Sequence, residues 1–515
     1  KAELETILHK EPQHARALAR LSDLEYDDDR FAEAGELYLR RVVVERAPEA
    51  QREILLRLGR IYTGHVPDAK RAIGAYARVL QTEADNHEAL AALSDLYLET
   101  GETKQALVVT EALAVIERDP ARRVAALIRC GQLHERAGEG RVAGARFRAA
   151  ADAAPRDVAA VGELARFLER ARDHVGRRAL LDHAVGLLRH DVERGRFELS
   201  TLRALVPMLQ ARGKTRAAAA AAQLLAALSD DEVERAAALG WAAPPPRGRR
   251  LAALARPEVD ERTYPPALPP GARHVFRLVG PLLARGAADL ARHGVARGER
   301  LSRGNAARDV FDGVSTELGV PDVDVFVRKP APLGASMGGV RVEPGERPAV
   351  ILAAELPALG GHALRFAAAR ALRLVATHLD LVLAVPPAAA GALLGGVIRQ
   401  FVPDFHHPEV RDEVLDVEAE RVAKILPRKL KPEVMPFAVE TAGAFDVAAL
   451  HAAVRDGANA VGLLACGDLP AALAAVLAGS GRTLAPADLS QHAEALALVR
   501  FALSDDHDDL AQAME

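Results

Sequence analysis

The sequence predicts a mostly α-helical protein, with an α-solenoid of stacked helical hairpins followed by a predominantly helical α+β domain that has a small β-sheet. Apolar and small residues recur about every 35 residues in the first part of the chain. Half of the 515 residues are hydrophobic and only 4% are aromatic, which suits close packing of Ala-rich helices. Strand-like runs join the helices only after Gly271. We expect repeats over 1–228, a Pro- and Arg-rich linker or extended strap over 229–270, and the second domain over 271–515.

The clearest copy of the repeat runs from Leu127 to Pro155, with small residues where two helices are expected to touch and an aromatic residue beside them. Equivalent leading-helix positions fall at residues 21, 58, 93, 130, 164 and 205, so successive copies are separated by 37, 35, 37, 34 and 41 residues. This spacing predicts five or six hairpins, and the copies after Val161 are degenerate. The residues that define the repeat are Leu58, Gly59, Tyr62, Leu93, Tyr97, Ala106, Gly131, Ala143, Phe147, Ala150 and Pro155.

These residues resemble the tetratricopeptide repeat, a helix-turn-helix unit of roughly 34 residues. A hairpin with apolar residues on both helices cannot bury them alone, so neighbouring hairpins must stack into a superhelix with a concave face. The resemblance implies that this face binds protein partners, including further copies of the chain. The alternative is a solenoid that only spaces or dimerises the chain.

Charge and cysteine content narrow the classes of partner. A formal net charge of −4 gives no strong field for nucleic acid or an anionic membrane. Cys130 and Cys466 are far apart within apolar helical patterns, so we expect buried thiols, with no disulfide and no cysteine zinc site.

The uncharged run from Leu381 to Ile398 reaches the lower length limit for a membrane span. Pro386 and Pro387 interrupt it, so we expect two buried helices joined at the prolines. The chain begins at Lys1 inside a predicted helix, so we expect upstream residues to be missing. The compartment stays open, with a cytoplasmic location favoured over a periplasmic one.

Several short motifs look functional but have simpler explanations. Gly213-Lys214-Thr215 resembles the end of a phosphate-binding loop, but Met208 stands where an earlier glycine is required, so we expect a helix-hairpin turn. Gly138 and Gly140 are likewise turn residues. We expect Trp241, the only tryptophan, to pack the strap onto a core. The basic cluster Arg247–Arg250 is expected to be a solvated linker charge, the alternative being contact with an acidic partner.

The second half predicts two helices, Val275–His293 and Asn305–Leu318, then a strand over Val323–Val327 and a hairpin of Gly339–Val342 with Ala349–Ala353. Long Ala- and Leu-rich helices follow.

This order resembles zinc peptidases of the HtpX and Ste24 kind over about residues 275–477, and Glu317-Leu318-Gly319-Val320-Pro321 is similar to the turn that opens their pattern. In the register that the resemblance implies, the two zinc histidines fall on Arg370 and Leu374, the general base falls on Ala371 and the glutamate ligand falls on Arg455. Asn459 replaces a family aspartate. Catalytic zinc needs about three His or carboxylate ligands and a nearby proton acceptor, so the resemblance implies a degenerate, inactive domain.

Other chemistries have weaker signals. Gly334-Ala335-Ser336-Met337-Gly338 fits the hydrolase elbow pattern, but a strand-like run follows where that elbow needs a helix. His406-His407 and His507, which lies among four aspartates, lack the helical spacing that presents two histidines to one metal. We expect both histidine clusters to be solvated surface groups.

The sequence therefore predicts a non-enzymatic scaffold or adaptor without a cofactor, in which a solenoid captures a protein partner and is fused to a catalytically inactive peptidase-like domain. One alternative is an active hydrolase, either a zinc peptidase whose ligands are misregistered or a serine enzyme using Ser336. Another is a structural subunit of a large envelope or filament assembly.

Overall fold

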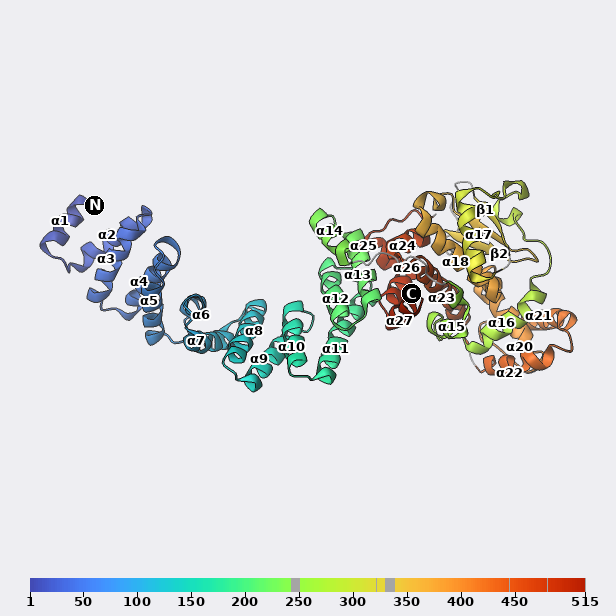
Figure 1. Ribbon diagram of the computed structural model, residues 1–515, viewed down its shortest axis with the longest axis horizontal. Helices are drawn as coiled ribbons and strands as arrows, with labels where there is room; N and C mark the ends of the chain where they lie inside the picture. Colours follow the sequence, from blue (N-terminus) through green and yellow to red (C-terminus); the bar gives the residue numbers. More distant parts are fainter. Residues whose placement is uncertain (242–250, 321, 329–338, 444, 479, 515) are drawn as a thin grey trace. The chain divides into compact units, whose positions relative to one another are not determined.

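A computed structural model describes the chain except for residues 242–250, 321, 329–338, 444, 479 and 515. The described residues form two compact units, Lys1–Ala184 and Val185–Glu515. Figure 1 labels most of their elements, which are numbered in chain order.

Unit 1 is a series of short α-helices joined by tight turns. Its helices are α1 (Ala2–Lys10), α2 (Ala15–Asp27), α3 (Phe31–Val44), α4 (Pro48–Arg60), α5 (Ala69–Thr82), α6 (His87–Glu99), α7 (Thr103–Ile116), α8 (Pro120–Arg136), α9 (Gly140–Ala153), α10 (Val158–Arg170) and the first part of α11 (His174–Glu193). A π-helical turn, Ile61–His65, extends α4. The repeat region predicted from the sequence is confirmed as a stack of helical hairpins.

Local sequence signals explain where these helices begin. The side chains of Asp68, Asn86, Asp119 and Asp157 each accept a hydrogen bond from the backbone N–H three residues later, which caps α5, α6, α8 and α10. Gly138, in the turn between α8 and α9, has a φ of +79°, a conformation that favours glycine.

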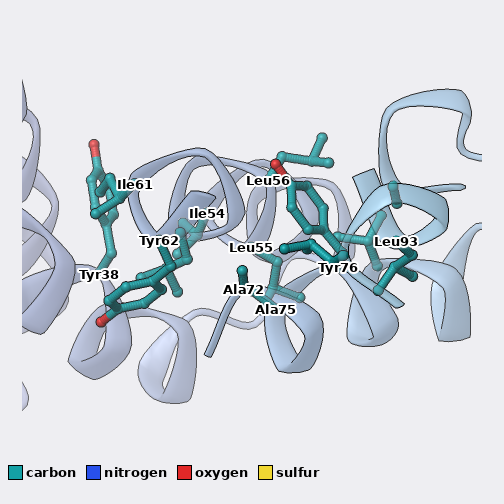
Figure 2. Close-up of a cluster of buried hydrophobic side chains, with 14 of the residues drawn as sticks. Tyr38, Ile54, Leu55, Leu56, Ile61, Tyr62, Ala72, Ala75, Tyr76 and Leu93 are labelled. Carbon is teal, nitrogen blue, oxygen red and sulfur yellow. The ribbon is translucent and has the colours of Figure 1, made fainter. Parts of the chain in front are cut away.

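Consecutive hairpins share one apolar core. Figure 2 shows the part in which Tyr38, Tyr62 and Tyr76 lie among aliphatic side chains of α4, α5 and α6. The three tyrosine rings are at most 4% exposed. Since each hairpin contributes residues to its neighbour's core, no hairpin could bury its apolar surface alone.

Unit 2 contains the rest of α11 and a larger set of helices. These are α12 (Leu199–Ala211), α13 (Thr215–Leu228), α14 (Glu232–Trp241), α15 (Pro257–Thr263), α16 (Pro270–Leu283), α17 (Ala306–Leu318), α18 (Gly361–Thr377), α19 (Asp380–Leu383), α20 (Pro387–Ile398), α21 (Asp412–Ile425), α22 (Lys431–Thr441), α23 (Val447–Cys466), α24 (Leu469–Leu477), α25 (Pro486–Gln491), α26 (Ala493–Ala502) and α27 (Asp505–Ala513). Helix α18 packs along α23, and α24 and α26 cover the pair.

The predicted small sheet is present in unit 2. It has three strands in the order β1 (Asp324–Val327), β3 (Ala349–Leu352), β2 (Val340–Glu343). Strands β1 and β3 are parallel, and β2 pairs antiparallel with β3. All four residues of β3 are buried, as expected for a central strand.

The compact units divide inside α11, and α13 packs against α24 and α27 of unit 2. One helix and one segment of unit 2 differ from the predictions. The predicted helix over Val275–His293 ends at Leu283 and is followed by a turn in which Gly286 has a φ of +103°. The described part of 229–270 is largely helical and not extended.

Of three further predictions about residues 213–250, one is wrong, one is confirmed and one concerns residues outside the described ranges. Trp241 was expected to pack onto a core, but it ends α14 and is 50% exposed. The Gly213-Lys214-Thr215 motif forms the predicted turn between α12 and α13. The Arg247–Arg250 cluster lies outside the described residues.

The apolar run Leu381–Ile398 forms α19 and α20, which are separated at the prolines as predicted. None of the helices in the described part of the chain has both the length and the apolarity needed to cross a bilayer. Cys130 and Cys466 are buried thiols that are not joined in a disulfide, and burial raises the pKa of the Cys130 thiol to about 12.

Candidate functional site

In unit 1, small residues and aromatic rings interlock the two helices of a hairpin. A Cβ atom placed at Gly131 of α8 would lie 2.6 Å from the ring of Phe147 in α9. At Gly59 of α4 the same atom would lie 2.4 Å from the ring of Tyr76 in α5. Only glycine therefore lets these helix pairs approach so closely.

The remaining residues predicted to define the repeat lie in or beside the same core. Leu58, Leu93, Ala106, Ala143, Phe147 and Ala150 are at most 1% exposed, and Tyr62 is 4% exposed. Tyr97 is half-buried against the core of the α3–α7 region, and Pro155 lies in the turn before α10. These residues hold the hairpins together and present little surface to a ligand.

A periodic series of ion pairs links equivalent helices of neighbouring hairpins, and the sequence analysis missed it. Leading helices α2, α4, α6, α8 and α10 carry three pairs whose partners are separated by 34 or 35 residues, with N–O distances of 2.6 to 2.9 Å: Asp23–Arg57, Asp95–Arg129 and Glu135–Arg170. The following helices carry Glu36–Arg71 and Glu111–Arg146, each 35 residues apart. An acid followed by an arginine one repeat later is a signal that could have revealed the series.

We call the surface bearing Asp23, Arg57, Asp95, Arg129, Glu135 and Arg170 the leading-helix face. These side chains are between 32% and 63% exposed, so their pairing groups remain accessible to another protein. Exposed pairs of this kind contribute little to stability, in general about 0 to 1 kcal/mol each. Their exposure makes them available for recognition.

In unit 2, the positions that the peptidase resemblance singles out lie in one buried region. Arg370 of α18 is 1% exposed, and Ala371 and Leu374 beside it are at most 2% exposed. Arg370 donates one hydrogen bond of 3.1 Å to the carbonyl oxygen of Val340 in β2 and another of 3.1 Å to Oε1 of Glu494 in α26.

Residues of α23 meet the same carboxylate. Asn459 donates a hydrogen bond of 2.8 Å to Oε1 of Glu494, and Nε of Arg455 lies 3.9 Å from Oε2. Arg455 also pairs with its neighbour Asp456 at 2.9 Å. We call Arg370, Arg455, Asn459 and Glu494 the Glu494 cluster.

In the Glu494 cluster, the carboxylate of Glu494 neutralises the buried guanidinium of Arg370. Burial lowers the pKa of the Arg370 guanidinium, and the neighbouring Glu494 carboxylate opposes that shift. Burial also raises the pKa of Asp456. Glu494 itself gave no motif, although a single carboxylate in the apolar stretch Ala493–Ala502 is an unusual feature that could have marked it.

One turn along α18, a second buried guanidinium is neutralised in the same way. Arg373 pairs with Asp260 of α15, which also pairs with Arg277 of α16 at 3.2 Å, and Arg373 and Asp260 are at most 6% exposed. Within the described residues, no group of three His, Cys, Asp or Glu side chains is placed to hold a metal ion. Both guanidinium groups of α18 are therefore paired with carboxylates from other helices.

The predicted solvation of the histidine clusters is partly wrong. His406 pairs with Asp412 at the surface, as expected, but His407 is 7% exposed and contacts the carbonyl oxygen of Phe445. His507 and Asp508 are at most 5% exposed because α27 packs against α13. Ser336 lies outside the described residues.

The acidic helix α27 is anchored to distant segments of unit 2. Oδ1 of Asp508 accepts backbone hydrogen bonds of 2.7 and 3.1 Å from Arg216 and Ala217, in the first turn of α13. Asp505 pairs with Arg189 and Arg212, and Asp509 pairs with Lys214 and Arg262, while Asp506 also pairs with Arg262. An acidic side chain of the chain itself thus occupies the helix N-terminus that follows the Gly213-Lys214-Thr215 turn.

Asp380 is a buried carboxylate that forms no ion pair with the described residues. Asp380, at the start of α19, is 1% exposed, and its Oδ1 has no hydrogen-bond partner among the described residues. Burial raises the pKa of Asp380 to about 7.

Comparison with known proteins agrees with the geometry of unit 1. A family profile described as tetratricopeptide repeat matches residues 68–129. Residues 68–129 thus resemble the tetratricopeptide repeat, a helical repeat that generally mediates protein–protein interaction. No curated protein matches the chain.

Among solved structures, similar chains include MamA from Desulfovibrio magneticus and a tetratricopeptide repeat protein from Parabacteroides merdae. The first has 19% identity and a TM-score of 0.25, covering 34% of this chain and 94% of that chain. The second has 18% identity and a TM-score of 0.29, covering 44% of this chain and 84% of that chain.

Proposed function

We propose that this protein is a non-enzymatic scaffold whose unit 1 captures a protein partner on the leading-helix face. The observation that carries the proposal is the series of ion pairs on this face, each between adjacent repeats and each at least one-third exposed on average. A partner that presents charges at the same intervals can exchange pairs with this series without disturbing the core beneath it. The buried residues of the hairpins supply rigidity, which reduces the entropy cost of binding.

The proposal extends to unit 2, which we infer to be a peptidase-like domain that has lost its zinc site. The convergence of Arg370, Arg455 and Asn459 on Glu494 supports this inference, because these are the positions that the resemblance assigns to metal ligands and their neighbour. A guanidinium is permanently charged and cannot ligate zinc. Under this hypothesis the buried cation of Arg370 neutralises the carboxylate of Glu494 and keeps α18, α23 and α26 packed.

The leading-helix face can be tested by exchanging charges within one pair. In the double variant Asp95→Arg/Arg129→Asp the pair can still form, but the charges offered to a partner are reversed. We expect an unchanged circular dichroism spectrum and thermal midpoint, together with loss of most of the partner captured from an extract of the source cells.

The matched control exchanges a pair on unit 2, Glu418→Arg/Arg421→Glu in α21, whose side chains lie 3.2 Å apart and are 22% and 47% exposed. We expect this variant to capture partners as the unaltered protein does. Equal capture by all three proteins would contradict a role for the leading-helix face.

Metal analysis tests the inference about unit 2. We expect less than about 0.1 zinc per purified chain, and about one tightly held zinc per chain would refute the loss of the metal site. Labelling of Ser336 by a fluorophosphonate probe would instead point to a serine hydrolase. Light scattering that shows large assemblies at all concentrations would favour a structural subunit.

A further inference from the structure

Helices α12, α13 and α14 of unit 2 line an open pocket of about 510 Å³. Val206 of α12 and Leu225 of α13 form part of its apolar lining and are at most 5% exposed. Val233 and Trp241 of α14 line the same pocket and are 78% and 50% exposed. Its volume lies within the range of about 300 to 1,000 Å³ that is typical of ligand pockets.

The sequence explains why α14 leaves this apolar surface open. Ala237 and Ala238 are the side chains between Val233 and Trp241 on the pocket side, and they are too small to fill it. Ala238 is the only residue of α14 that is buried. By contrast, α6 buries five residues, and α7 packs against it.

Polar groups fix one wall of the pocket. Glu234 accepts hydrogen bonds of 2.6 Å from Arg203 and 2.8 Å from Ser229, which hold α14 against α12 and α13. Because Pro207 has no N–H, the carbonyl oxygen of Arg203 lacks its usual helical donor. Arg203 and Pro207 both line the pocket.

Exposed carboxylates cluster where α14 begins. Asp230, Asp231 and Glu232 are all exposed, and Asp231 is the one of the three that lines the pocket. No ion pair joins these three carboxylates to another residue in the described ranges. An apolar pocket beside unpaired carboxylates favours an apolar group flanked by positive charge.

We propose that this pocket, the α12–α14 pocket, binds a peptide segment of a partner protein in which a large apolar side chain is flanked by lysine or arginine residues. The apolar side chain enters between Val206, Leu225 and Trp241, while the flanking cations lie over the carboxylates of Asp230, Asp231 and Glu232. The exposed face of the Trp241 ring adds a cation–π contact.

This inference rests on the proposed scaffold function in that it names a class of partner. It uses only residues of unit 2, however, so it can fail while the leading-helix face still captures its partner. The reverse also holds, because the Asp95/Arg129 exchange leaves the α12–α14 pocket unaltered.

Trp241 is the only tryptophan of the chain, so the intrinsic fluorescence of the full-length protein reports directly on the pocket. The probe is a blocked hexapeptide with a Leu-Phe pair between two lysines on each side. Matched probes replace the lysines with glutamates, or the Leu-Phe pair with Gly-Ser. We expect only the first peptide to shift Trp241 emission saturably to shorter wavelength and to protect it from acrylamide quenching.

Two variants localise the binding. Ala237→Arg places a long cation into the pocket and should weaken binding of the Leu-Phe peptide at least tenfold. Ala236→Arg adds the same side chain to an exposed position of α14 that does not line the pocket, and should change binding less than twofold. Asp231→Asn keeps an oxygen acceptor for the backbone N–H groups of Val233 and Glu234, so the helix cap survives while one carboxylate charge is lost.

Asp231→Asn should therefore weaken binding severalfold and reduce its dependence on salt concentration. Equal binding of the lysine and glutamate peptides would overturn the proposal, as would undiminished binding by Ala237→Arg. Trp241 that is already protected from acrylamide in the free protein would show that the chain or a second copy fills the pocket, and would also overturn it.

Discussion

The interlock between Gly131 and Phe147 allows a direct test of how hairpin packing depends on one missing methyl group. In Gly131→Ala, the new Cβ atom would lie 2.6, 2.7 and 2.9 Å from three carbons of the Phe147 ring, which is fully buried. Overpacking of this kind costs about 1 to 3 kcal/mol. Alanine in a helix interior recovers about 1 kcal/mol relative to glycine, so we expect a net loss of about 1 kcal/mol.

The matched control is Gly162→Ala in α10, the next leading helix. A Cβ atom at Gly162 meets nothing within 4 Å, so the substitution should stabilise its helix by about 1 kcal/mol. The two substitutions are chemically identical, and their difference isolates the packing cost at about 1 to 3 kcal/mol.

Hydrogen exchange measured by mass spectrometry suits this test, because it reports the stability of α8–α9 and α10 separately in the full chain. Adding Phe147→Leu to Gly131→Ala should recover part of the loss, since the smaller side chain leaves room for the methyl group. Two glycine substitutions with the same sign and size of effect would refute the reasoning.

The remaining predictions concern buried charges of unit 2. Glu494→Gln should destabilise unit 2 by about 3 to 5 kcal/mol, because it leaves the Arg370 cation unneutralised. Urea unfolding followed by Trp241 fluorescence measures this loss. The double variant Glu494→Gln/Arg370→Met should recover most of the lost stability, and no recovery would argue against a pairing role. Burial raises the pKa of Asp380 from its ordinary value of 3.8 to about 7, so this carboxyl ionises first in the unfolded chain, and stability falls as pH rises from about 4 to about 7, with no further change above that range. Asp380→Asn should remove this fall in stability, which amounts to roughly 4 kcal/mol at about 1.4 kcal/mol per pH unit. Parallel stability–pH profiles of the variant and the unaltered protein would contradict the raised pKa of Asp380. Asp508→Ala should lower the stability of unit 2 by about 2 kcal/mol, because it removes the cap of α13. We expect faster hydrogen exchange of the Arg216 and Ala217 amides. Unchanged exchange of these amides would mean that the cap does not stabilise the helix.

Local patterns predicted much of the fold. The spacing of small and aromatic residues around Gly131 and Phe147 identified the hairpins, because both partners lie within one repeat. The three strands were also predicted near their observed bounds, since alternation and a Pro-Gly turn are local signals. The separation of α19 from α20 followed from the restriction that proline places on a helix.

Features that depend on distant partners could not be predicted. The sequence suggests that the aspartates near His507 are solvated, since their partners lie in α13 and α15, more than 240 residues earlier in the chain. Glu494 lies on a helix with no recognisable motif, and only the folded chain brings it to Arg370. The opening beside Trp241 likewise depends on how little of α14 is covered, which residue types alone do not determine.

The cap that Asp508 supplies to α13 affects the order in which the protein can form during synthesis. The carboxylate and the backbone N–H groups that it binds are 291 and 292 residues apart. By contrast, the ion pairs of unit 1 join residues separated by one repeat, so each can form soon after its second partner leaves the ribosome. At typical rates of about 5 to 20 residues per second, α13 waits for its cap for roughly 15 to 60 seconds. A ribosome that stalls before α27 would therefore carry finished repeats together with a second unit that lacks its last contacts.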